Sequence, residues 1–179
     1  ASLFAVGFST RNIKLLGLLA NAMFFFVGWH YVKQIFGCVI VTNAMQKTYY
    51  NKFERWALKA NLFSLWAISF FGSNVGLSNY MQDGIPYTSL NLPPQTLEFA
   101  YACLWFSGAA VVITHVLKYL RDGQLPSWSA IFAVGSIYAW YLPLCQHPMF
   151  MHTIPFFHSL QYLLFVFAFR RNKVEMSSP

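Results

Sequence analysis

The fold is decided by a long apolar run near the start of the chain, LLGLLANAMFFFVGWHYVKQIFGCVIVTNAM, between Leu15 and Met45. As a helix rising 1.5 Å per residue, about 30 residues exceed the roughly 30 Å hydrocarbon layer of a bilayer. The run is interrupted at His30, Lys33 and Gln34. It therefore predicts one long tilted transmembrane helix, or one span with an interfacial lead-in.

The composition of the whole chain also indicates a membrane protein. Of its 179 residues, 57% are hydrophobic, 20% are aromatic and only 9% are charged, whereas soluble domains carry about 25% charged residues. The formal net charge is +7, but the cations lie in short connections between apolar runs, which membrane topology requires. We therefore expect the lipid bilayer as the partner, other membrane subunits as candidate partners, and no nucleic acid.

Further apolar runs of span length follow the first one. Backbone polar groups in hydrocarbon must form hydrogen bonds within the segment, so these runs should be helices. The prediction is an all-α, polytopic transmembrane helix bundle with about five spans. It forms a single domain over residues 1–179, with spans at about 15–45, 57–77, 97–117, 128–146 and 150–169.

Lysine and arginine are distributed unevenly among the connections. They concentrate at 46–59, at 118–127 and in the tail at 170–173, whereas 78–98 and 147–151 have none. By the positive-inside rule, the cationic connections and the C-terminus should face the cytoplasm, most simply across a bacterial inner membrane. Segment 78–96 is expected to be an ordered extracytoplasmic loop or a short interfacial helix.

The polar residues inside the predicted spans are the candidate functional residues, because burying them in lipid is costly. Neutral imidazole is a common metal ligand, and helix bundles build metal sites from inward-facing side chains. We expect metal ligation by His30 and His158, with His152 next. Neighbours at i+3 and i+4 supply the supporting polar residues Lys33, Gln34, Gln161 and Tyr162. His115 is expected at the opposite, cytoplasmic side.

Two stretches carry a resemblance to known proteins, Gly28–Gly37 around His30 and Phe156–Leu164 around His158. They resemble motifs of uncharacterised bacterial multispan proteins and, more distantly, of the Brp/Blh carotene dioxygenase family, membrane enzymes thought to hold iron with histidines. The resemblance implies that His30 and His158 are iron ligands. It also implies an oxygenase acting on a lipophilic substrate reached from the bilayer.

Other functions remain open at this stage. The chain is also suited to be a non-enzymatic subunit of a larger membrane complex, binding chlorophyll, carotenoid or haem, or acting as a scaffold. Histidine ligates such cofactors axially, and the aromatic residues would line their grooves. A transporter component is the third hypothesis, weakened by the lack of acidic residues within the predicted spans. No catalytic residue is predicted.

Overall fold

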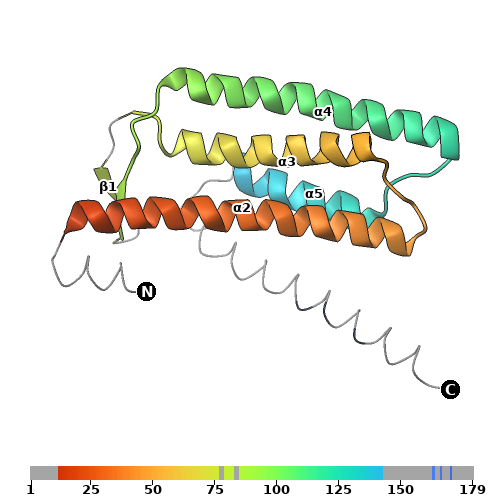
Figure 1. Ribbon diagram of the computed structural model, residues 1–179, viewed down its shortest axis with the longest axis horizontal. Helices are drawn as coiled ribbons and strands as arrows, with labels where there is room; N and C mark the ends of the chain where they lie inside the picture. The colour runs from red at the N-terminus through yellow and green to blue at the C-terminus, as the bar shows by residue number, and fades with distance from the viewer. Residues whose placement is uncertain are drawn as a thin grey trace. The chain divides into compact units, whose positions relative to one another are not determined.

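The computed structural model describes residues 12–76, 79–82 and 85–142, together with Leu163, Val166 and Arg170. The chain divides into two compact units, residues 1–142 and 143–179, and all elements discussed below belong to the first unit. Figure 1 shows them in chain order: α2 (Ile13–Met45), α3 (Lys52–Gly72), β1 (Asn79–Gln82), β2 (Ile85–Thr88), α4 (Pro94–Asp122) and α5 (Trp128–Tyr141). The predicted span at 150–169 lies almost entirely outside the described residues.

The first four apolar runs are helices, and the differences from the predicted bounds have local causes. The run at 15–45 is one unbroken helix of 33 residues. Helix α3 covers Lys52–Gly72 instead of 57–77, because a capping box of Asn51 and Glu54 fixes its start. Helix α5 ends at Tyr141, where Leu142 is already extended and a proline follows.

The segment predicted as a loop or interfacial helix is instead built around a β-hairpin. Strands β1 and β2 pair antiparallel, with Asn79 opposite Thr88 and Gln82 opposite Ile85. The fully buried Asn74 lies beneath the hairpin, and its amide donates to the Tyr87 hydroxyl at 3.1 Å. The prediction of an ordered connection holds, and the helix at its end is the first turn of α4, which begins at Pro94.

The four helices run alternately up and down, so the α2–α3 and α4–α5 connections lie at the same end of this unit (Figure 1). The hairpin lies at the other end. The two cation-rich connections therefore share one end, as the alternation of charge predicted. Helix α3 contacts each of the other helices, whereas α4 packs chiefly against α3.

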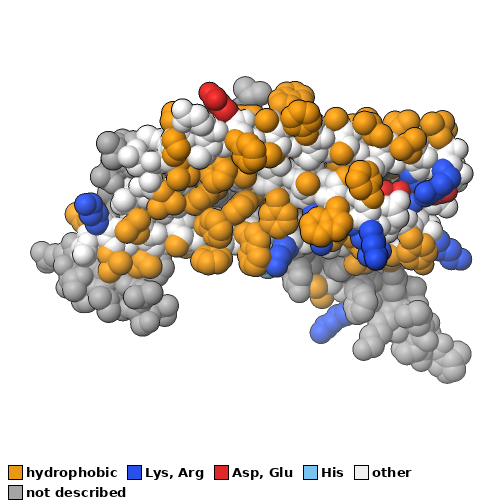
Figure 2. All heavy atoms as spheres, turned by 45° about the horizontal axis from the view of Figure 1, so that its top comes forward, with side chains coloured by type: hydrophobic (Ala, Val, Ile, Leu, Met, Phe, Trp, Pro, Cys, Tyr) orange, Lys and Arg blue, Asp and Glu red, His pale blue; other side chains and the backbone are white. Residues whose placement is uncertain are grey.

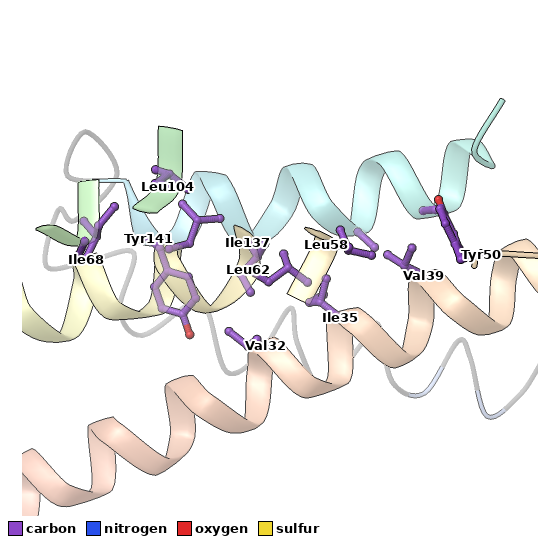
Figure 3. Close-up of a cluster of buried hydrophobic side chains, with 14 residues drawn as sticks. Val32, Ile35, Val39, Tyr50, Leu58, Leu62, Ile68, Leu104, Ile137 and Tyr141 are labelled. Carbon is purple, nitrogen blue, oxygen red and sulfur yellow. The ribbon is translucent and has the colours of Figure 1, made fainter. Parts of the chain in front are cut away.

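The core follows the helical spacing of three and four residues. Its centre holds Val32, Ile35 and Val39 from α2, which meet Leu62 of α3 and Ile137 of α5 (Figure 3). Residues at these spacings share one helix face, so α2 turns a single stripe toward the bundle.

Along its middle and C-terminal part, helix α4 buries several polar side chains and exposes large apolar ones. Trp105 and Phe106 are 77% and 80% exposed, whereas Ser107, Thr114 and Lys118 are buried. The described residues contain two helices long and apolar enough to cross a membrane, α2 and α4, and only 17% of the apolar stretch of α4 is buried. Figure 2 shows hydrophobic side chains spread over one face of the molecule. In a water-soluble protein an amphipathic helix shows the opposite arrangement, with its apolar side chains facing the core and its polar ones facing water.

Two glycines of α2 provide a matched test of this packing. A Cβ at Gly28 would lie 2.7 Å from Trp66 Cδ1 and 3.1 Å from the Tyr141 hydroxyl, whereas a Cβ at Gly37 meets nothing within 4 Å. Gly28→Ala should lower the free energy of unfolding by about 1–2 kcal/mol through overpacking. Gly37→Ala should raise it by up to about 1 kcal/mol through helix propensity. Unfolding in mixed micelles measures both, and equal effects would contradict the packing.

Candidate functional site

The structure places the predicted metal-site residues of α2 on the side facing away from the core. His30 and Lys33 are exposed and Gln34 is half-buried. The Lys33 ammonium lies 3.8 Å from the centroid of the Trp29 ring, a cation–π contact within its own helix. The predicted residues His152, His158, Gln161 and Tyr162 lie outside the described residues.

Metal binding therefore stays a prediction. In the described part of the chain, no three His, Cys, Asp or Glu side chains gather closely enough to hold a metal ion. The predicted ligand set of His30, His158 and His152 has only His30 within that part.

The structure instead brings together an apolar groove of about 520 Å³ between α4 and α5. Its bottom is formed by the buried side chains of Val39, Tyr50 and Leu58, and its sides by the two helices. The full lining consists of Val39, Tyr50, Leu58, Val111, Val112, His115, Val116, Tyr119, Leu125, Pro126, Trp128, Ala130, Ile131 and Val134. We call it the α4–α5 groove.

The rim of the α4–α5 groove is made of exposed apolar side chains. Val112 and Val116 line it from α4, Ile131 lines it from α5, and all three are exposed. The rim residues lie on the outer faces of the two helices, so the groove opens sideways.

A hydrogen-bonded pair, Tyr50 and His115, lines the α4–α5 groove. His115 Nδ1 lies 2.7 Å from the Val111 carbonyl oxygen, which can only accept, so Nδ1 carries the ring proton. Nε2 is then an acceptor, and the Tyr50 hydroxyl donates to it at 3.1 Å. The two rings also pack edge to face, with centroids 5.6 Å apart.

Asn43 holds Tyr50 from behind and joins α2 to the start of α5. Its side chain is fully buried, its Nδ2 donates to the Val39 carbonyl at 2.8 Å, and Nδ2 lies 3.5 Å from the Tyr50 hydroxyl. Its Oδ1 accepts from the Ser127 backbone N–H at 3.1 Å. Ser127 in turn caps α5 through its hydroxyl. One amide thus fixes both the tyrosine and the α4–α5 connection.

A buried ion pair lies beside Tyr50. Lys118 is 4% exposed and Glu54 is 5% exposed, with Nζ and Oε2 3.9 Å apart. Lys118 Nζ also donates to the Tyr49 carbonyl at 2.7 Å and lies 3.6 Å from Asp122 Oδ2. Charges this buried need partners of opposite sign and hydrogen bonds, and this pair has both.

The environment of Tyr50 keeps its hydroxyl protonated. Burial, and to a smaller extent the charge of Glu54, raise the pKa of Tyr50 to about 12. At neutral pH the tyrosine therefore acts as a neutral donor toward His115. The Tyr50–His115 pair is uncharged on the tyrosine side and satisfied on both nitrogens of the imidazole.

Sequence reasoning singled out the deep histidines and set His115 aside as a local cytoplasmic-side residue. His115 lines the groove as the hydrogen-bonded partner of Tyr50, which lies 65 positions earlier in the chain. A signal was present in α4 itself, because Ser107, Thr114 and Lys118 follow at spacings of seven and four and form a polar stripe. Such a stripe on an apolar helix marks its inward face.

The chain matches no protein-family model, no curated protein and no solved structure. The resemblance to the Brp/Blh carotene dioxygenase family therefore stays a prediction carried by the two sequence motifs.

Breaking the buried ion pair tests its contribution to stability. Lys118→Met should lower the free energy of unfolding by about 3 kcal/mol, because the buried Glu54 carboxylate loses its buried cation. The double variant Glu54→Gln/Lys118→Met should recover part of that loss, since glutamine keeps the capping box. The exposed Lys52→Met serves as the control. A Lys118→Met variant as stable as the Lys52→Met variant would contradict the pairing.

Proposed function

We propose that this chain is an integral membrane protein whose α4–α5 groove binds a lipophilic molecule that enters sideways from the hydrocarbon layer. One observation carries the proposal: an apolar groove opens between two helices whose outer faces are themselves apolar. In water such a rim would be an aggregation surface. In a bilayer the same rim is an entrance for a molecule dissolved in lipid.

The bilayer placement is supported by the exposed surface of α4. Fully burying one large apolar side chain contributes about 1.5–3 kcal/mol, and α4 leaves several of them uncovered by protein: Phe99, Trp105, Phe106, Val112, Ile113, Val116, Leu117 and Leu120. Lipid would supply the missing cover. We further propose that the chain crosses a bacterial inner membrane about five times.

The orientation is supported by the end at which cations and exposed aromatic side chains gather. Lys47, Lys52 and Arg55 lie at the α2–α3 end, with the exposed Trp56 beside them and Trp128 at the neighbouring start of α5. Tryptophans are typical of either membrane interface, and an excess of Lys and Arg is typical of the cytoplasmic one. We propose that this end and the C-terminus face the cytoplasm.

The lining supports a neutral ligand of small-molecule size. Among the described residues, no Lys, Arg, Asp or Glu lines the α4–α5 groove, so a charged group entering it would lose its hydration without gaining a partner from them. A volume of about 520 Å³ lies within the roughly 300–1,000 Å³ of ligand pockets.

Blocking the groove from its rim tests this function. Val112→Trp should fill the groove, whereas Ile113→Trp adds the same side chain to an exposed neighbour outside the lining. Binding of tritium-labelled dodecyl methyl ether to protein in lipid nanodiscs, corrected with empty nanodiscs, measures the effect. We expect saturable binding that Val112→Trp weakens by about tenfold or more, a loss of about 1.4 kcal/mol, and that Ile113→Trp leaves unchanged. Equal binding by the two variants would refute the groove as the site.

The second candidate function is the histidine-ligated oxygenase that the two motifs imply. The observation favouring it is the position of His30 near the middle of α2, on the exposed side of a helix long enough to cross a membrane. Histidine side chains within membrane-spanning helices commonly serve as functional residues. Iron is the metal proposed, with His158 and then His152 as further ligands.

Metal analysis of the purified protein tests the oxygenase candidate. Bound iron should fall in both His30→Ala and His158→Ala, because each would lose a ligand, and should persist in His115→Gln. Metal content unchanged in both alanine variants would exclude these ligands. Visible absorption bands without iron would instead favour the alternative of a subunit that binds chlorophyll or carotenoid.

A further inference from the structure

We infer that the ligand of the α4–α5 groove is a neutral lipophile carrying one hydroxyl group, which it donates to the hydroxyl oxygen of Tyr50. This inference rests on the proposed function and specifies the chemistry of the same site. It follows from counting the hydrogen-bonding capacity that the Tyr50–His115 pair leaves open.

The imidazole has no open position. Its Nδ1–H donates to the Val111 carbonyl at 2.7 Å, and its Nε2 accepts from Tyr50 at 3.1 Å. The hydroxyl proton of Tyr50 is engaged in that second bond. A ligand that needs a donor, such as a ketone, would have to break the Tyr50–His115 bond before it could be recognised.

The open capacity is an acceptor on Tyr50. A phenolic oxygen accepts as well as donates, and among the described residues its donor is Asn43 Nδ2, whose bond of 3.5 Å is at the outer limit of a hydrogen bond. Asn43 Nδ2 already donates to the Val39 carbonyl at 2.8 Å. A ligand O–H can therefore bind the Tyr50 oxygen without breaking the bond from Tyr50 to His115.

The surroundings argue for a neutral alcohol rather than an anionic lipid. The nearest cation, Lys118, is already paired with Glu54 and Asp122 and donates to the Tyr49 carbonyl. It is also absent from the lining. A carboxylate or phosphate at the bottom of the groove would find no unpaired cation among the described residues. The other polar groups of the lining, on Tyr119 and Trp128, belong to exposed rim residues.

The test compares 1-dodecanol with dodecyl methyl ether on the full chain in nanodiscs, with concentrations expressed per lipid to remove partitioning. The wild type should bind the alcohol about fivefold more tightly, the effect of one net hydrogen bond. The double variant Tyr50→Phe/His115→Leu removes both polar groups and should bind the two ligands equally. The matched control Tyr119→Phe removes a rim hydroxyl and should keep the fivefold preference.

The outcomes separate this inference from the proposed function. Equal binding by the wild type, or a preference that survives in the double variant, overturns the hydroxyl assignment while leaving the groove as a lipophile site. A Val112→Trp variant that binds both ligands normally overturns the proposed function instead.

A second measurement decides the case if the double variant loses the ether as well. A hydrogen bond donated to Tyr50 strengthens the bond from Tyr50 to His115, because linked hydrogen bonds polarise one another. Dodecanol must then shift the ¹⁵N resonance of His115 Nε2 in the wild type, and the ether must not. An unshifted resonance with saturating dodecanol overturns the inference.

Discussion

Buried asparagine side chains bridge the helices of this unit at three levels. Asn21 of α2 donates to Asn74 after α3, Asn61 of α3 accepts from Tyr138 of α5 at 2.6 Å, and Asn43 accepts from the Ser127 backbone. In a bilayer, apolar side chains gain little from leaving lipid for protein, so packing and hydrogen bonds between helices become the main forces of association. The arrangement of the helices depends on these amides.

The α4–α5 groove is a consequence of where those bonds lie. Asn61 is bonded on both sides, to Ser107 of α4 through Nδ2 and to Tyr138 of α5 through Oδ1. Helix α3 thus holds both neighbours through one residue and stands between them. Toward the cation-rich end, α4 is held to α3 by the Lys118–Glu54 pair, and α5 is held to α2 by Asn43. The two helices are tied to different partners there, and the groove lies between them.

The apolar runs were enough to predict the four helices α2 to α5, and the alternating charges were enough to predict their shared cationic end. Both features can be read from short stretches of the sequence. The hairpin was missed although Asp83-Gly84, a dipeptide typical of tight hairpin turns, stands between its strands. The groove could not be predicted in the same way. Predicting it requires knowing which face of α4 points toward the bundle. It also requires the contact of His115 with Tyr50, a loop residue far away in the sequence. Single-residue polarity favoured His30, which the structure places on the exposed side of α2.

The Tyr50–His115 pair keeps one hydrogen-bonding polarity because the phenol stays protonated and the imidazole is committed to a backbone carbonyl. Burial, and to a smaller extent the charge of Glu54, raise the pKa of Tyr50 to about 12, so the phenol does not ionise in the physiological range. A protonated Tyr50 must donate to His115 Nε2, since the other imidazole nitrogen is committed to Val111. Lys118 balances the charge of Glu54 without reaching the lining. The Val111 carbonyl thus sets the direction of these hydrogen bonds, and the Tyr50–His115 pair offers a ligand an acceptor without a charge.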